Sequence, residues 1–452
     1  MSPSSSPNLP HEILLHVIDT LGVSIDVDPI ACQDLATCSL VCRSFQARAY
    51  QYLFSQLKFN FVNGGPPRLS RFCATLQTLD EARSDTRPTS LTRELRSLEF
   101  VSLYERDSQD RADPTWAEVM AKVLDKIGTR LEDFGMQALV HVSIQWGVLS
   151  PVFNRAFYAL LHSPTLRTLR LVGFTHIPPS IIYRASGIKH IDLRLSVALD
   201  SSSDPEPDMQ DLRISSSAFI QPEHICTDSL KSIMHMMKPR FPSAMGAEAR
   251  PARRLTNLKT MVAFALTTVE QVNTFAQILL FARNSLEDMH LILEHQFTGL
   301  PTFPITSFPN LRVFRITHRE AFAASLTTER TPPEILRSVL DVTVDSNIPF
   351  PPHLSVLEIG LDVWFFQSKL RPFAGNETEW VRLALLLTHD KYRNVKVVQI
   401  VLTLRGEEDA RRVVTLEANR RIIQDMTDVF NARVVGQNRR LVVVARHLLN
   451  DW

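Results

Sequence analysis

The sequence predicts an α/β protein in which a small helical N-terminal module precedes an irregular solenoid of parallel strands with outer helices. Three observations predict it. Residues 9–60 are apolar, helical in pattern and nearly free of glycine and proline. A short L-x-x-L-x-L phrase then recurs along the chain. Its last two apolar residues are two positions apart, as in a strand with one buried face. Helical stripes precede several of these phrases, and helix followed by strand, repeated along a chain, gives a parallel sheet.

Composition excludes several classes of protein. Hydrophobic residues make up 44% of the 452 residues, which is enough for a core and excludes disorder throughout. The formal net charge of +1 gives no indication of a nucleic-acid partner or an acidic membrane surface. Five cysteines, an odd number, are typical of a reducing compartment. The chain start lacks the pattern of a signal peptide, and runs such as residues 383–387 are too short to span a membrane. We therefore expect cytoplasmic or nuclear localisation, or both.

The N-terminal module begins with one amphipathic helix. Residues 1–8 are rich in serine and proline and are expected to form a loose tail. From residue 9 onward, apolar side chains recur at intervals of one, three and four, which lines one helix face. Pro10 suits a first turn, Glu12 suits the positive helix start, and Gly22 suits the helix end.

A second helical pattern starts at Asp34 and continues to Leu57. The breaker cluster at 63–67 then marks a boundary, so we divide the chain into a helical module at 9–60 and a body at 68–452. A module of about 50 residues is at the size limit for independent stability. Its many large apolar side chains indicate that part of its surface is covered, by the rest of the chain or by a partner.

At these residues the sequence resembles the F-box family. The resemblance consists of an ordered set: Leu9-Pro10, Glu12, the apolar helix from Ile13 to Ile18, Asp34-Leu35, Val41-Cys42-Arg43 and Phe45. Two features depart from the family pattern. Phe45 stands where tryptophan is common, and the loop before Asp34 is longer than usual, as in many fungal members.

The resemblance implies a function in ubiquitin ligation. Members of the family dock on the Skp adaptor subunit of a cullin-RING (SCF-type) ubiquitin ligase and carry a protein target. The implied Skp-binding residues are Leu9, Pro10, Glu12, Ile13, Leu14, Val17, Ile18, Leu35, Leu40, Val41, Cys42 and Phe45. The alternative is that these helices are only a structural cap packed on the following domain.

Possible metal motifs in the same region fail on spacing. His11 and His16 lie five residues apart, which rotates the second away from the first and excludes a zinc HExxH motif. Cys32, Cys38 and Cys42 lack a CxxC-type pair, so we interpret them as buried small hydrophobic residues. The sequence predicts no metal and no cofactor.

The body carries a degenerate L-x-x-L-x-L phrase. In each copy the second and third apolar residues are two apart and share one face of a strand, while the first lies in the turn leading in. The copies are Leu95-Leu98-Phe100, Leu131-Phe134-Met136, Leu166-Leu169-Leu171, Ile188-Ile191-Leu193, Leu258-Met261-Ala263, Leu286-Met289-Leu291, Leu311-Phe314-Ile316, Leu354-Leu357-Ile359 and Val395-Val398-Ile400.

Helical stripes at 116–127, 152–161, 272–280 and 380–387 precede four of the phrases. This plan resembles a leucine-rich-repeat solenoid. The asparagine or cysteine of regular repeats is missing, as at Thr175 after Leu166, and the spacings are irregular. We expect insertions near 200–211 and 238–254. The alternative is an ordinary α/β domain with coincidental phrases. Residues 441–445 are predicted to form a terminal edge strand flanked by Arg439, Arg440 and Arg446.

The sequence contains no catalytic motif that we recognise. GxSxG, GxGxxG and GxxxxGK[ST] are absent, and Glu407-Glu408-Asp409 fit a solvated helix start. His141 and His190 fit structural histidines. We therefore expect a non-enzymatic substrate receptor with an unidentified protein target. The alternatives are a repeat scaffold with a helical cap, or an enzyme built from scattered residues.

Overall fold

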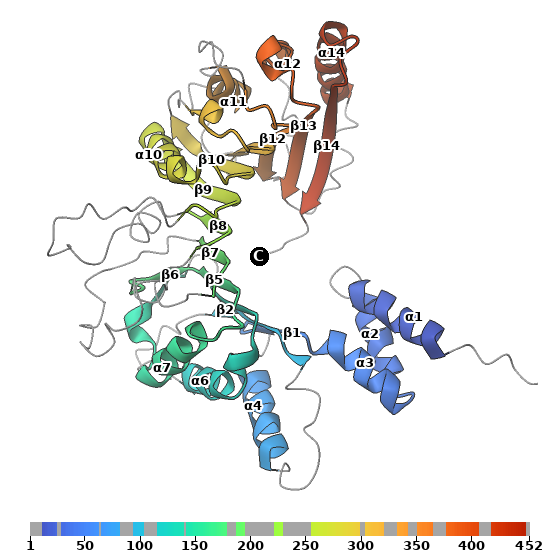
Figure 1. The fold of residues 1–452 in the computed structure, drawn as a ribbon, viewed down its shortest axis with the longest axis vertical. Helices are drawn as coiled ribbons and strands as arrows, with labels where there is room; N and C mark the ends of the chain where they lie inside the picture. The colour runs from blue at the N-terminus through green and yellow to red at the C-terminus, as the bar shows by residue number, and fades with distance from the viewer. Residues whose placement is uncertain are drawn as a thin grey trace, which may run out of the picture. The chain divides into compact units, whose positions relative to one another are not determined.

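The computed structural model describes residues 11–24, 29–62, 65–81, 94–103, 115–139, 142–178, 187–194, 221–228, 255–298, 303–320, 332–341, 350–364, 377–405 and 417–448 (Figure 1). The expected tail at 1–8 and the expected insertions near 200–211 and 238–254 lie outside these residues. The chain forms two compact units: residues 1–188 with 200–220, and residues 189–199 with 221–452.

Unit 1 begins with three helices, which we call the helical lobe: α1 (His11–Ser24), α2 (Pro29–Cys38) and α3 (Arg43–Leu53). Pro29 occupies the first position of α2, where its missing N–H costs nothing. Helix α1 continues past Gly22, which was expected to end it. A Cβ on Gly22 would lie 2.3 Å from the Tyr52 ring, so this glycine serves close packing of α1 on α3.

The rest of unit 1 is a parallel sheet with helices. Strands follow the order β1-β2-β3-β5. Strands β4 and β6 form a separate, short parallel pair. The elements are β1 (Gln56–Asn60), α4 (Gly65–Glu81), β2 (Ser97–Leu103), α6 (Thr115–Ile127), η2 (Gly128–Arg130), β3 (Asp133–Ala138), β4 (Ile144–Gln145), η3 (Trp146–Val148), α7 (Pro151–Leu161), β5 (Thr168–Val172) and β6 (Phe174–Thr175).

Unit 2 repeats this plan with strands in chain order from β7 to β14, all parallel where they pair. Its elements are β7 (His190–Arg194), β8 (His224–Thr227), β9 (Thr260–Thr268), α10 (Val269–Leu279), η7 (Leu280–Ala282), β10 (Asp288–Thr298), η8 (Ile305–Ser307), β11 (Val313–Glu320), α11 (Pro332–Asp341), β12 (Val356–Trp364), α12 (Glu377–Leu387), η9 (Asp390–Tyr392), β13 (Val397–Arg405), α14 (Glu417–Arg433) and β14 (Arg440–Leu448).

The predicted α/β class with parallel strands is confirmed. All nine L-x-x-L-x-L phrases lie on strands, and the four helical stripes become α6, α7, α10 and α12. The expectation that residues 56–60 continue a helix is wrong. These residues form strand β1, which pairs with β2. Strand β8 was missed because proline and threonine replace the outer apolar positions of its phrase, which leaves Ile225 alone.

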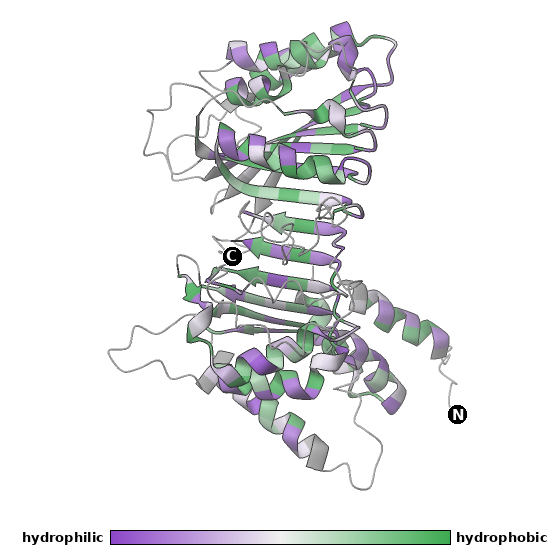
Figure 2. Ribbon diagram, turned by 60° about the vertical axis from the view of Figure 1, so that its left-hand side comes forward, coloured by the Kyte–Doolittle hydropathy of each residue, from purple (hydrophilic) through white to green (hydrophobic). Residues whose placement is uncertain are grey.

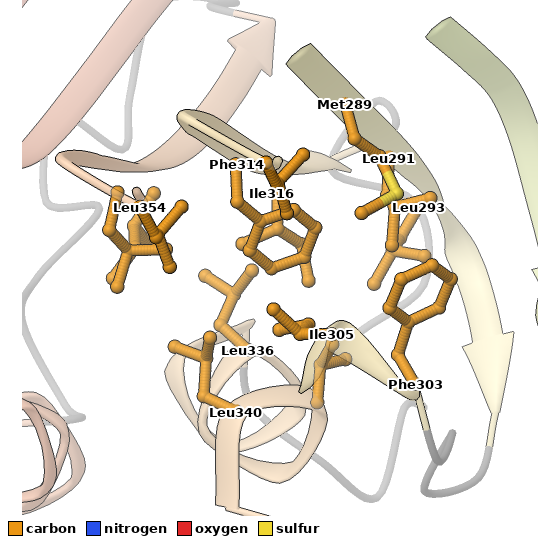
Figure 3. Packing of buried hydrophobic residues seen from close by; sticks show 14 of the residues in the cluster. Met289, Leu291, Leu293, Phe303, Ile305, Phe314, Ile316, Leu336, Leu340 and Leu354 are labelled. Atoms are coloured by element: carbon orange, nitrogen blue, oxygen red, sulfur yellow. The ribbon is translucent and has the colours of Figure 1, made fainter. Parts of the chain in front are cut away.

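The core of unit 2 lies between one face of the sheet and the helices. Strand residues at alternate positions are buried against α10, η8, α11, α12 and α14. Figure 3 shows this packing for Met289, Leu291 and Leu293 of β10, Phe314 and Ile316 of β11, Ile305 of η8, and Leu336 and Leu340 of α11. Green and purple bands accordingly alternate along helices and strands (Figure 2). Capping side chains begin two helices, Ser150 before α7 and Thr268 before α10.

Two strands contain bulges that restore burial of the next apolar residue. The β2–β3 register shifts between Phe100 and Leu103, and Ser102 has a φ of 56°. In β9 the register shifts before Leu266, and Ala265 has a φ of 55°. Because each bulge inserts a residue, Leu103 and Leu266 return to the core face.

Candidate functional site

The helical lobe has a core of its own. Ile18 of α1, Leu35 of α2 and Ala49 of α3 form one buried cluster. The side chains packed against it all come from the same helices: Leu15, Leu21, Cys38, Phe45, Tyr52 and Leu53. The lobe therefore satisfies its own packing within the described residues and does not use the sheet to cover this cluster.

An ion pair fixes α1 against α3. Arg48 donates to both carboxylate oxygens of Asp19, with Nε–Oδ1 at 2.6 Å and Nη2–Oδ2 at 2.9 Å. The Tyr52 hydroxyl donates to Oδ1 at 3.1 Å. The hydrogen bond from Arg48 is the main cause that lowers the pKa of Asp19. This bidentate arrangement sets the rotation of α1 relative to α3.

The lobe exposes large apolar side chains at positions that sequence analysis assigned to docking. The exposed fractions are 47% for Ile13, 49% for Val17, 85% for Leu40 and 66% for Val41. Ile13 and Val17 lie one turn apart on α1, and Leu40 and Val41 lie in the turn between α2 and α3. Such side chains gain from burial only if something else covers them.

The other assigned residues have different surroundings. Glu12 and Cys42 are exposed, and Leu14 and Phe45 are half-buried. Ile18 and Leu35 are buried in the lobe core, so they hold the exposed residues in place and have no free surface to offer. Leu9 and Pro10 lie outside the described residues.

Ile30 was missed as a surface residue. It is 64% exposed on α2, in the stretch that the sequence analysis assigns to the loop before Asp34. Pro29, a frequent first residue of a helix, is the signal that could have moved the start of this helix forward.

The cysteines differ from the expectation of burial. Cys32 and Cys42 are exposed and Cys38 is half-buried, so the interpretation as buried small hydrophobic residues is wrong for the first two. Cys42 precedes α3, and its hydrogen bond with the Ser44 hydroxyl is the main cause that lowers its pKa. Within the described ranges, no group of three His, Cys, Asp or Glu side chains is placed to hold a metal ion. The helices described there include none that is long and apolar enough to cross a membrane.

The sheet face opposite the core carries linked charged residues on β10, β11 and β12 of unit 2. Arg315 of β11 contacts Asp288 of β10 at 2.8 Å and Glu358 of β12 at 3.7 Å. Arg319 contacts Glu294 at 2.9 Å and Asp362 at 3.4 Å in the same way. Each arginine thus joins carboxylates on the two neighbouring strands, which ties the three strands together across this face.

His290 of β10 lies on the same face, opposite Arg315 in the strand register. Its Nε2 is 2.8 Å from the Thr317 hydroxyl. Burial, and then the charges of Arg315 and Arg319, lower its pKa to about 4. On β12, Gly360 makes room for Thr317, because a Cβ there would lie 2.4 Å from the Thr317 hydroxyl oxygen. His190, by contrast, is exposed on β7, and its ring lies 4.3 Å from that of His224. His141 lies outside the described residues.

The leading edge of the sheet carries a row of polar residues, most of them charged. At most positions of this row the residue's carbonyl accepts two consecutive N–H groups of the next repeat, as Glu223 does from Lys259 and Thr260. The row runs Ser55, Arg96, Glu132 and Arg167 in unit 1, and Lys189, Glu223, Lys259, Glu287, Arg312, Ser355 and Lys396 in unit 2.

Charges alternate in much of this row and pair across strands. Lys189 and Lys259 both donate to Glu223, at 2.6 and 2.9 Å, and their hydrogen bonds lower its pKa to about 2. An open polar cavity of 580 Å³ lies along this edge of unit 2. Its lining includes Asn257, Asn284, Asn310, Ser285 and His353, with the paired charges of Glu287 and Arg312.

Comparison with solved structures shows what this chain is similar to. An internalin from Listeria monocytogenes is 10% identical, with a TM-score of 0.28, and the match covers 81% of this chain and 79% of that one. No family model matches the sequence, and no curated protein matches it. The strand pairings themselves define the chain as a leucine-rich-repeat-like solenoid of parallel strands with N-terminal helices.

Proposed function

We propose that this protein is the substrate-receptor subunit of an SCF-type cullin-RING ubiquitin ligase. On this proposal the helical lobe docks the Skp adaptor, and through it a cullin, while the repeat body binds a protein target. The observation that carries the proposal is the lobe itself, which has its own core and leaves Ile13, Val17, Leu40 and Val41 exposed.

The exposed side chains suit an apolar docking contact. Full burial of a side chain of this size contributes about 1.5–3 kcal/mol, so covering the exposed parts of this set favours association and offsets part of its cost. Leu40 and Val41 stand in a turn held by backbone hydrogen bonds, from Leu40 N to Thr37 O and from Val41 N to Cys38 O. A preorganised turn loses little conformational entropy on binding.

The repeat body supports target binding through its polar surfaces. Solenoids present extended faces to protein partners. The arginine-linked face of β10, β11 and β12 and the charged leading edge both offer paired polar groups held rigidly by the sheet. In the proposed mechanism these surfaces hold a target near a ubiquitin-charged enzyme, which raises the effective concentration of the reacting groups. No residue of this chain takes part in bond formation.

The alternative function is a repeat scaffold whose N-terminal helices are a cap. A cap would cover the end of the sheet with the apolar side chains of α1 and of the turn before α3. The exposure of Ile13, Val17, Leu40 and Val41, and a lobe core that draws only on lobe residues, favour the docking function. Truncation separates the two functions. Loss of residues 1–53 leaves the sheet folded if the lobe is a docking module and unfolds it if the lobe is a cap.

The docking function is tested by co-expression of the full chain with a Skp subunit. The expected result is co-purification of the two proteins at equal stoichiometry. A Leu9→Ala plus Pro10→Ala variant should lose at least about tenfold in affinity, the equivalent of about 1.4 kcal/mol. Unchanged co-purification of this variant, or no association of the wild-type chain, would contradict the proposal.

A further inference from the structure

The last strand of unit 2 has one open edge. Strand β14 pairs with β13 along its whole length, from Val397↔Arg440 to Arg405↔Leu448. It ends the strand order, and within the part of the chain that the structure describes no strand pairs with its other side. An unpaired edge of this length is a template for a further strand.

The hydrogen-bonding pattern identifies the backbone groups on that edge. Arg440 N donates to Lys396 O, so Arg440 points its backbone toward β13. In a parallel ladder successive residues direct their N–H and C=O groups to opposite sides of the strand. The odd-numbered residues therefore direct these groups outward: Leu441, Val443, Ala445 and His447.

The strand is held in place as a rigid template. Leu441 and Val443 pack against the core of unit 2. At the start of the strand Arg439 donates to Val395 O at 3.1 Å and to Leu387 O, and its guanidinium lies 5.4 Å from the Phe430 ring centroid. These contacts fix the direction of β14, so an added strand would find its hydrogen-bonding partners already aligned.

The charge of this segment indicates what can pair with it. Residues 439–448 contain three arginines, Arg439, Arg440 and Arg446, and no acidic residue. Two copies of this strand pairing edge to edge would bring six positive charges into one short ribbon, which disfavours a second copy of the chain. An extended segment with carboxylates would instead complement the exposed Arg440.

We propose that the open edge of β14 binds an extended, acidic segment of a partner protein by strand addition. Backbone hydrogen bonds to the four outward-facing residues give the affinity, and carboxylates near Arg440 give the preference for acidic sequences. This goes beyond the function proposed above and does not depend on the helical lobe.

The first test asks whether the edge is open in the free full-length chain. Amide hydrogen exchange should be faster at Leu441 and Val443 than at Val442 and Val444, whose N–H groups face β13. Equal and strong protection of all four amides in the free chain would mean that another segment of the same chain already covers the edge. That result would overturn the proposal.

The second test uses a defined probe, an acetylated and amidated heptapeptide of alternating glutamate, valine and threonine, read by fluorescence anisotropy. We expect saturable binding to the full-length chain, and protection of Leu441 and Val443 when the probe is bound. Arg440→Glu should weaken binding at least about tenfold. The matched control, Arg420→Glu, makes the same charge change at an exposed position on α14 and should leave binding unchanged.

Two altered probes and one further variant complete the test. A probe with lysine in place of glutamate, and one with N-methylated alternate amides, should both fail to bind. Val443→Pro removes one outward N–H and should weaken binding while thermal unfolding reports its fold. Binding that N-methylation does not reduce, no binding of the acidic probe, or a concentration-dependent dimer that Val443→Pro abolishes would each overturn the proposal.

Discussion

Asp19 on α1 and Arg48 on α3 form a bidentate ion pair, with both carboxylate oxygens within 2.9 Å of guanidinium nitrogens. The two residues are 29 positions apart, and the pair joins the first and last helices of the lobe. It shows that the lobe is held together by specific contacts as well as by its small core.

Removing this pair should loosen the lobe. The side chains of Arg48 and Asp19 are 40% and 31% exposed, so solvent screening limits the effect of Asp19→Asn to about 1 kcal/mol. The pKa of Asp19 is lowered in the folded state, so its contribution is present above the unfolded value and is lost as pH falls through the folded value. The unfolding temperatures of wild type and Asp19→Asn should therefore converge toward the acidic end of a series from about pH 3 to about pH 7, which includes the ordinary carboxyl pKa. A constant difference across this range would contradict the account.

Gly22→Ala should destabilise the lobe more than the loss of the ion pair does. The added Cβ meets the Tyr52 ring, and Tyr52 is held by its hydrogen bond to Asp19. We expect a cost of about 1–3 kcal/mol for this overpacking. Circular dichroism during thermal unfolding measures it, with Gln33→Ala at an exposed position of α2 as the control. A Gly22→Ala protein as stable as that control would refute the close packing of α1 on α3.

Ala265→Gly should stabilise unit 2. Ala265 has a left-handed φ of 55° in the bulge of β9, and glycine adopts this conformation without the steric cost of a Cβ. We expect a gain of about 1 kcal/mol in the free energy of unfolding, measured by urea denaturation. The same substitution at Ala263, which is buried in the regular part of β9, should destabilise instead. Destabilisation by both substitutions would argue against the bulge.

His290 should make the stability of unit 2 depend on pH. Its folded pKa is about 4, below the ordinary value of 6.5, so the unfolded chain binds more protons between these values. Stability is therefore complete above about pH 6.5 and is lost as pH falls toward 4. His290→Gln should flatten this part of the profile in urea unfolding experiments. A profile identical to wild type would show that His290 is not buried as a neutral side chain.

The sequence predicts the repeat body well because one physical pattern defines each repeat. A strand with one buried face needs apolar residues two apart, and all nine recognised phrases satisfy this. Strand β8 escaped detection because Pro222 and Thr227 occupy the outer positions of its phrase, although it pairs with β7 and β9 as the other strands do.

The candidate site is less accessible to sequence reasoning. Apolar periodicity identifies the face of a helix but not what covers it, so Ile18 and Val17 look equivalent in the sequence. In the structure Ile18 is buried in the lobe and Val17 is exposed. The cysteines illustrate the same limit, since a thiol is often buried but Cys32 and Cys42 are not. The terminal edge strand predicted at 441–445 is confirmed as β14, because a run of valines between arginines suits a strand at the end of a sheet.

The most direct test of the account is the affinity of the full-length chain for a purified Skp subunit, measured by titration calorimetry for matched variants. The account predicts that Ile13→Asp plus Leu40→Asp weakens binding at least about a hundredfold, because charges would enter an apolar contact. Val62→Asp and Val435→Asp, at exposed apolar positions outside the lobe, should bind as wild type does. Equal affinity of all these proteins, or no measurable binding by the wild-type chain, would contradict the central claim.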